Sequence, residues 1–161
     1  MIIARLRAIP LIAAGESFYH LTVGLLERFV APVLDLAIRL WMARVFFNSG
    51  LVKIMDWDAT VFLFQDEYKV PILPPEVAAV FGTTFELGMP VLLVLGLFAR
   101  LAALPLIVMA LVIQFVLGAN NPAYDSVEHF YWLFLLATIV VRGPGKLSLD
   151  HLIHRTAQTA P

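Results

Sequence analysis

The sequence predicts an all-α membrane protein: a bundle of four transmembrane helices with an amphipathic helix at its N-terminus. The first observation is composition, since 61% of the 161 residues are apolar and only 14% are charged. Soluble domains are ~45–50% apolar and ~25% charged, so this chain has too few polar residues to cover a surface in water. The second is that long apolar runs follow one another along the chain. A bilayer is therefore the expected solvent.

Charge and cysteine content exclude several classes of function. The net charge is −1, which is not the basic balance of a nucleic-acid-binding protein. The chain has no cysteine, so disulfides, thiolate metal sites and thiol–disulfide exchange are excluded. We expect no intrinsic cofactor, and a redox role would require a bound group, a quinone or a partner protein.

The N-terminal region, residues 1–32, is predicted to be an interfacial segment on the cytoplasmic side. One face of a helix here would carry Phe18, Leu21, Leu25 and Phe29. A signal peptide is the alternative for residues 1–16, but Arg5 and Arg7 interrupt its short apolar core. The predicted membrane domain follows at 33–155, with a flexible tail at 156–161.

Four segments are candidate membrane spans: 33–55, 77–99, 101–118 and 129–141. A helix needs about 20 residues to cross the hydrocarbon core. The first two segments fit, the third is adequate and the fourth is short. Three spans with a re-entrant fourth segment therefore stay open as an alternative. Residues 57–70, which mix aromatic and acidic side chains, are expected to lie along the membrane surface.

The distribution of charge predicts orientation. Seven basic residues fall on one side of a four-span chain and two, Lys53 and Lys69, on the other. The seven are Arg5, Arg7, Arg28, Arg100, Arg142, Lys146 and Arg155. Because cytoplasmic loops carry the excess of Lys and Arg, both termini should be cytoplasmic in a bacterial inner membrane.

The last apolar run ends in "VRGPGK". Gly143 can adopt a left-handed conformation that closes a helix, and Pro144 prevents its continuation. Arg142 would then lie at the membrane interface. His151 and His154 are three residues apart, but no third ligand is nearby, so contact with lipid headgroups is expected rather than a metal site.

Charged residues within the spans predict the polar core. Estimated depths place Arg44 level with Glu86, which predicts an ion pair between them. Asp35 lies four residues before Arg39 and is the expected partner of that arginine. In a shifted register, both arginines would contact Glu86 instead.

Three further polar residues, Asn48, Gln114 and His129, are predicted to form a layer nearer the outer surface. Polar groups at membrane depth favour function, so Glu86 and His129 are candidate catalytic residues. Candidate ligand-binding residues are Arg39, Arg44, Asn48, Glu86 and Gln114. A purely structural role as ion pairs and interhelical hydrogen bonds is the alternative.

The motifs along the chain are similar to those of the DoxX family of small bacterial membrane proteins. They are "RLWMARVFFNSGLVK" with Arg39, Gly50 and Lys53, "FELGMPVLLVLGLFAR" with Glu86 and Arg100, and "GPGKLSLD" with Gly143, Pro144, Gly145, Ser148 and Asp150. The resemblance extends over about residues 33–153.

The resemblance implies a membrane subunit associated with a redox or oxidative or sulfur stress system. Relatives include the membrane subunit of an archaeal thiosulfate:quinone oxidoreductase. In such a role Arg39, Arg44 and Asn48 would bind a quinone carbonyl, and Glu86 or His129 would transfer protons. If the chain is enzymatic, it would act within a quinone-linked complex. Partners would be the bilayer, an oxidoreductase and further copies of the chain, but not nucleic acid. A non-catalytic scaffold or assembly factor and a small-molecule or lipid carrier are the alternatives.

Overall fold

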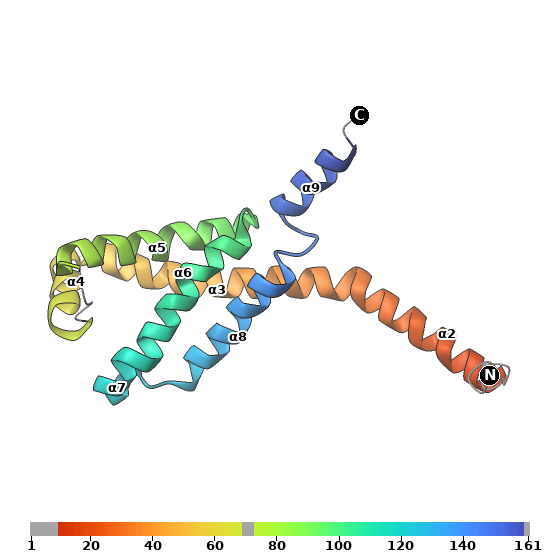
Figure 1. Cartoon of the computed structure of the whole chain (residues 1–161), viewed down its shortest axis with the longest axis horizontal. Helices are drawn as coiled ribbons and strands as arrows, with labels where there is room; N and C mark the ends of the chain where they lie inside the picture. The colour runs from red at the N-terminus through yellow and green to blue at the C-terminus, as the bar shows by residue number, and fades with distance from the viewer. Residues whose placement is uncertain (1–9, 69–72, 160–161) are drawn as a thin grey trace. The chain divides into compact units, whose positions relative to one another are not determined.

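The computed structural model describes residues 10–68 and 73–159, which form helices and turns without strands (Figure 1). The all-α prediction is confirmed. The chain divides into two compact units, residues 1–34 and residues 35–161.

The N-terminal unit is helical wherever it is described. It contains α2 (Pro10–Leu25) and η1 (Leu26–Val30), followed by the first residues of α3 (Ala31–Met55). The predicted apolar face is exposed along its length, at Phe18, Leu21, Leu25 and Phe29. The predicted helix is therefore confirmed, while its location at a membrane surface stays a prediction.

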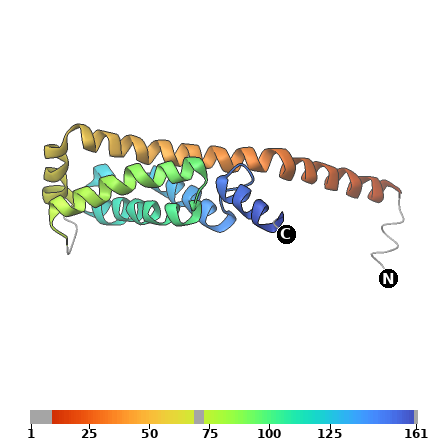
Figure 2. The same cartoon turned by 90° about the horizontal axis from the view of Figure 1, so that it is seen from above.

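The second unit contains four long helical segments. They are α3, α5 (Pro75–Leu95), α6 (Ala99–Leu111) with its continuation through η3 (Val112–Leu117) and α7 (Gly118–Asn120), and α8 (Val127–Arg142). Within it, α5 runs alongside α3, and α6 alongside α8 (Figures 1 and 2). The predicted spans 33–55, 101–118 and 129–141 are helical throughout, whereas in 77–99 the helix ends at Leu95 and a turn follows. The helix α9 (Leu149–Thr159) follows, so residues 156–159, predicted as a flexible tail, are helical.

These four segments share one apolar core. Its buried members are Met42, Ala43, Phe46, Leu93, Ala99, Ala102, Ala103, Leu106, Ala110, Leu136 and Ile139. Small residues permit close approach of the helices. A Cβ atom on Gly50 would lie 2.8 Å from Cγ of Leu87, so this glycine lets α3 contact α5.

Two of the helical segments, Pro75–Leu95 and Ala99–Asn120, are long and apolar enough to cross a membrane. The 25-residue α3 is long enough, but Asp35, Arg39, Arg44 and Lys53 are spread along it. The 16-residue α8 is short. The all-α fold is therefore confirmed, whereas the bundle of four transmembrane helices stays a prediction.

Two glycines end helices, and for Gly143 the sequence predicts this. Gly96 closes α5 in the left-handed region, with φ of 64°, and the N–H groups of Gly96 and Leu97 donate to the carbonyls of Leu93 and Leu92. Gly143 closes α8 at φ of 87°, and its N–H donates to the carbonyl of Ile139. The predicted stop at Arg142 is confirmed.

The connection from α3 to α5 is also helical, through α4 (Trp57–Leu63) and η2 (Phe64–Tyr68). Asp56 caps α4 by accepting a hydrogen bond from the N–H of Ala59 at 3.0 Å. Phe64 packs on Ala78, Ala79 and Gly82 of α5. Residues 57–68 of the segment expected along the membrane surface are thus helical, its last two residues lie outside the described part, and its location at a membrane surface stays a prediction.

Candidate functional site

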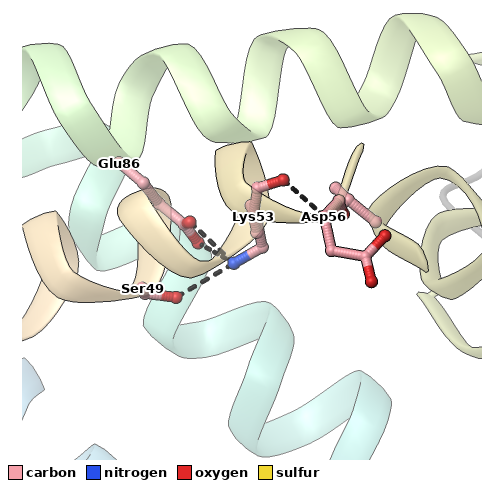
Figure 3. A network of polar contacts seen from close by, with 5 residues as sticks. Ser49, Lys53, Asp56 and Glu86 are labelled. Carbon is pink, nitrogen blue, oxygen red and sulfur yellow. Dashed lines mark hydrogen bonds and ion pairs between the residues drawn. The ribbon is translucent and has the colours of Figure 1, made fainter. Parts of the chain in front are cut away.

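A buried ion pair links α3 to α5. The ammonium group of Lys53 lies 2.6 Å from Oε2 and 2.8 Å from Oε1 of Glu86, and it donates to Oγ of Ser49 at 2.9 Å (Figure 3). Only 9% of Lys53 and 4% of Glu86 is exposed. The hydroxyl of Thr60 donates to the carbonyl of Lys53 and holds α4 over this group. We call Ser49, Lys53 and Glu86 the Lys53 cluster.

The predicted pairing of Arg44 with Glu86 is wrong. That prediction aligned the outer ends of the first two spans, whereas Gly50, not Arg44, lies against Glu86 and Leu87. The helix α5 therefore extends beyond the end of α3. The packing of Phe64 on the first turns of α5 accounts for this offset, because the connecting helix covers the extension.

Arg39 is fully buried at the opposite end of α3. Its Nη1 donates to the carbonyls of Leu93 at 3.0 Å and Val94 at 3.3 Å, and its Nη2 donates to the carbonyl of Leu147. The last carbonyls of a helix lack partners within that helix. Arg39 therefore supplies donors to the end of α5 and joins it to the segment that follows α8.

The predicted pair of Asp35 with Arg39 is also wrong. Asp35 lies 3.4 Å from Nε of Arg142, at the end of α8. Gly145 also lies close to Asp35, since a Cβ on this glycine would be 2.7 Å from the aspartate Cβ. An aspartate one turn before Arg39 was a reasonable helical neighbour, but the chain after α8 folds back on it.

The C-terminal motif supplies the remaining contacts at this end. The carboxylate of Asp150 accepts hydrogen bonds from the N–H groups of Phe98, at 2.9 Å, and Ala99, at 3.3 Å, and so caps α6. The hydroxyl of Ser148 donates to the carbonyl of Gly145 and accepts from the N–H of His151. We call Arg39, Gly96, Leu147, Ser148 and Asp150 the latch.

Another polar group lies between η3 and α8. Gln114 donates to Oδ1 of Asp125 at 2.6 Å, and its carbonyl oxygen lies 2.9 Å from Nδ1 of His129. Because Asp125 requires the amide NH₂, the carbonyl faces the histidine and Nδ1 carries the proton. The predicted proximity of Gln114 and His129 is confirmed. The third residue of the predicted layer, Asn48, is exposed and does not join them.

Arg44 and Asn48 lie instead on the exposed side of α3. An open groove of about 330 Å³ runs here between α3 and α5, and Arg44 is the charged residue among its apolar lining. The lining residues are Leu40, Ala43, Arg44, Phe47, Pro90, Val91, Val94 and Leu95. In the described part of the chain, no carboxylate forms an ion pair with Arg44. The predicted ligand set of Arg39, Arg44 and Asn48 is thus divided between two places.

Two tyrosines, Tyr68 of η2 and Tyr124 of the short helix η4 (Pro122–Tyr124), lie at the Lys53 end. The hydroxyl of Tyr124 donates to Oε2 of Glu67, and this hydrogen bond raises the pKa of Tyr124 to about 12. Burial, and next the carboxylate of Glu86, raise the pKa of Tyr68. Both rings line an open hollow of about 360 Å³. Since Glu67 and Asp66 also line it, this hollow is acidic.

Sequence reasoning missed Ser49, Asp125 and the tyrosines. The spacing of Ser49 and Lys53, four residues apart on one helix, was a signal that they share a face. The described residues contain no group of three His, Asp or Glu side chains placed to bind a metal. His151 and His154 are exposed on α9.

Comparisons with known proteins place this architecture in a family. A relative from Haemophilus influenzae, described as an uncharacterized protein, is 32% identical over 133 residues, which cover 77% of this chain and 85% of that protein. No solved structure matches the chain. The DoxX family model matches residues 34–119, the region of α3, α5 and α6 that carries Arg39, the Lys53 cluster and Arg44. The chain belongs to the DoxX family.

Proposed function

We propose that this DoxX protein is a non-catalytic, multi-pass subunit of the bacterial inner membrane that anchors or assembles an oxidoreductase system. Its four spans would be α3, α5, the continuous segment from α6 to α7, and α8. The charges of α3 do not oppose this, because Asp35 lies by Arg142, Lys53 pairs with Glu86, and Arg39 binds backbone carbonyls. A helix as short as α8 is accommodated by modest thinning of the bilayer.

Charge at the two ends of the domain supports cytoplasmic termini. The latch end carries Arg100, Arg142 and Lys146, whereas the Lys53 end carries Asp56, Asp58, Glu67, Asp125 and Glu128. Basic residues concentrate on the cytoplasmic side of membrane proteins.

A structural polar core is supported by the way its groups are satisfied. Both terminal nitrogens of Arg39 donate to carbonyls, although its buried Nε has no hydrogen-bond partner among the described residues, and the carboxylate of Glu86 binds the ammonium of Lys53. Such contacts fix the positions of helices in a membrane. Proton transfer by Glu86 would first require separation from Lys53.

The observation that carries the subunit role is Arg44. It is exposed ~16 Å along the helix axis from the end of α3, where a span lies deep in hydrocarbon. An arginine at mid-membrane costs about 2.5–3.5 kcal/mol, so an acidic side chain on a partner transmembrane helix is the expected neighbour. A second copy does not supply one, because Glu86, the mid-helix acid in the described part, is buried on Lys53.

The experiment is site-specific photo-crosslinking of the full-length protein in its own membrane. A photoreactive residue at Asn48 should crosslink to a membrane protein with an acidic residue in a span, and Arg44→Leu should remove that crosslink. The matched control is the same group at Val108, which is also exposed but lies on α6. Equal crosslinking from both positions, or a crosslink unaffected by Arg44→Leu, would contradict the proposed interface.

A quinone in the same groove is the second candidate function. The groove combines apolar walls with the guanidinium of Arg44, and Asn48 lies one turn further along the helix. Arg44 would donate to a quinone carbonyl. Lipid extraction from gently purified protein distinguishes the candidates: a stoichiometric quinone that disappears in Arg44→Leu supports this one, and retention of a protein partner without quinone supports the subunit role.

A further inference from the structure

An open hollow of about 500 Å³ lies where α8 ends and α9 begins. The positively charged or titratable basic side chains that line it are Arg100, Arg142, Lys146, His151 and His154. They come from the start of α6, the end of α8, the motif that follows it and α9. Folding therefore brings them together from four segments.

Glycine at position 143 shapes the wall of this hollow. A Cβ atom there would lie 3.1 Å from Nη2 and 3.2 Å from Nε of Arg100, closer than most real contacts. The φ of 87° also disfavours any side chain at this position. The guanidinium of Arg100 thus lies directly against the backbone where α8 ends.

The positive charges in the hollow are only partly neutralised by neighbouring carboxylates. Asp150 is the acidic residue of the lining, and both of its oxygens accept hydrogen bonds from the N–H groups of Phe98 and Ala99. Asp35 lies 3.4 Å from Nε of Arg142. Among the described residues, Arg100 and Lys146 form no ion pair. Donors and positive charge are therefore available to an anion.

Exposed apolar side chains around the hollow favour an amphiphilic anion over a small soluble one. Leu101, which follows Arg100, is 63% exposed, and Val141, which precedes Arg142, is 76% exposed. Leu152 and Ile153 of α9 are also exposed. An amphiphile with a phosphate in the hollow would place its acyl chains along these apolar side chains. Basic pockets between helices on the cytoplasmic side suit acidic lipid headgroups.

We propose that this hollow is a binding site for the phosphate headgroup of an anionic phospholipid. Arg100 and Lys146 bind the phosphate oxygens, Arg142 adds charge, and the imidazoles of His151 and His154 contact the rest of the headgroup. The site depends on the membrane location and not on the partner at Arg44, so it can fail or succeed independently of that interface.

The test is native mass spectrometry of the full-length protein, delipidated in detergent and titrated with phosphatidylglycerol or with zwitterionic phosphatidylcholine. We expect one saturable phosphatidylglycerol, and Arg100→Gln or Lys146→Gln should each weaken its binding about tenfold. The matched control is Arg155→Gln, which removes one exposed charge from α9 outside the lining and should change binding less than about twofold.

The alternatives give different results. If excess inorganic phosphate displaces the lipid, and phosphatidylglycerol binds no better than phosphate, the hollow is a free-phosphate site and the lipid proposal is wrong. If Arg155→Gln weakens binding as much as Arg100→Gln, the attraction belongs to the whole basic surface. Equal binding of phosphatidylcholine would also overturn the proposal, because it would remove the role of net negative charge.

Discussion

Arg39 and Arg44 are five residues apart on one helix, and their environments are opposite. Arg39 is fully buried and donates to three carbonyl groups, whereas Arg44 is exposed beside an apolar groove. Five residues turn a helix by about 140°, so the two side chains leave α3 on different sides. The comparison shows that charge within a span has no single meaning. One arginine holds helix ends together within the fold, and the other is the residue at which we propose a partner.

The latch also shows what the family motifs do. Gly96 reverses the chain after α5, Arg39 binds the carbonyls at the end of that helix, and Asp150 caps the next one. Residues from three distant motifs therefore meet at one end of the domain. These contacts position helices and involve no exposed reactive group.

The comparison is tested most directly by matched substitutions. Arg39→Met should lower the free energy of unfolding by about 3–5 kcal/mol, because it removes charge-assisted hydrogen bonds and leaves helix-end carbonyls without donors. Arg44→Met should change it by less than about 0.5 kcal/mol, or raise it, since the charge leaves an exposed apolar surface. Unfolding by sodium dodecyl sulfate in mixed micelles measures both. Equal losses would mean that Arg44 also has a structural partner.

The Lys53 cluster provides the next test. Glu86→Gln or Lys53→Met alone should cost about 3 kcal/mol, since each leaves a buried charge without its counter-ion. The double variant should recover much of that loss, because neither charge is then buried. The same unfolding assay gives the coupling energy. Costs that simply add would show that the two groups act independently.

Several of these features were readable from the sequence. Gly143 and Pro144 mark a helix end that depends on local backbone chemistry, and α8 stops where they predict, whereas the turn at Gly96 falls inside the predicted second span. The buried face of α3 was also visible in the spacing of its residues. Arg39, Met42, Phe46, Gly50 and Lys53 recur every three or four residues, and all of them are buried. That spacing separates Arg39 from Arg44.

The ion pairs could not be predicted in the same way. Whether Glu86 faces Arg44 or Lys53 depends on how far α5 extends past α3, and that offset follows from Phe64 packing on Ala78 and Ala79. Asp35 meets Arg142 only because the chain reverses after α8. Both are contacts between distant segments, on which helical periodicity carries no information.

A smaller effect is expected within the latch at Asp150. Asp150→Ala should lower the free energy of unfolding by about 1–2 kcal/mol, because the carboxylate caps α6. It also stabilises Phe98 in the left-handed region, at φ of 47°. The control is Asp58→Ala in the exposed first turn of α4, which should cost a few tenths of a kcal/mol. Thermal unfolding in detergent compares the two variants. Equal losses of stability in both would mean that Asp150 does not stabilise the latch.

The smallest effect is expected where the polar contact faces water, at Tyr124 and Glu67. The hydrogen bond to Glu67 raises the pKa of Tyr124 to about 12, so its contribution to stability is complete below the ordinary value near 10. It should be lost as the pH rises through about 12. Glu67→Gln should return the pKa of Tyr124 toward 10, as measured by ¹³C NMR of labelled tyrosine, with Tyr124→Phe to assign the signal. A pKa that does not move would mean that Glu67 is not the acceptor. If Glu67→Gln caused a large fall in the free energy of unfolding at neutral pH, contacts on the water-facing side would contribute as much as the buried contacts of Arg39.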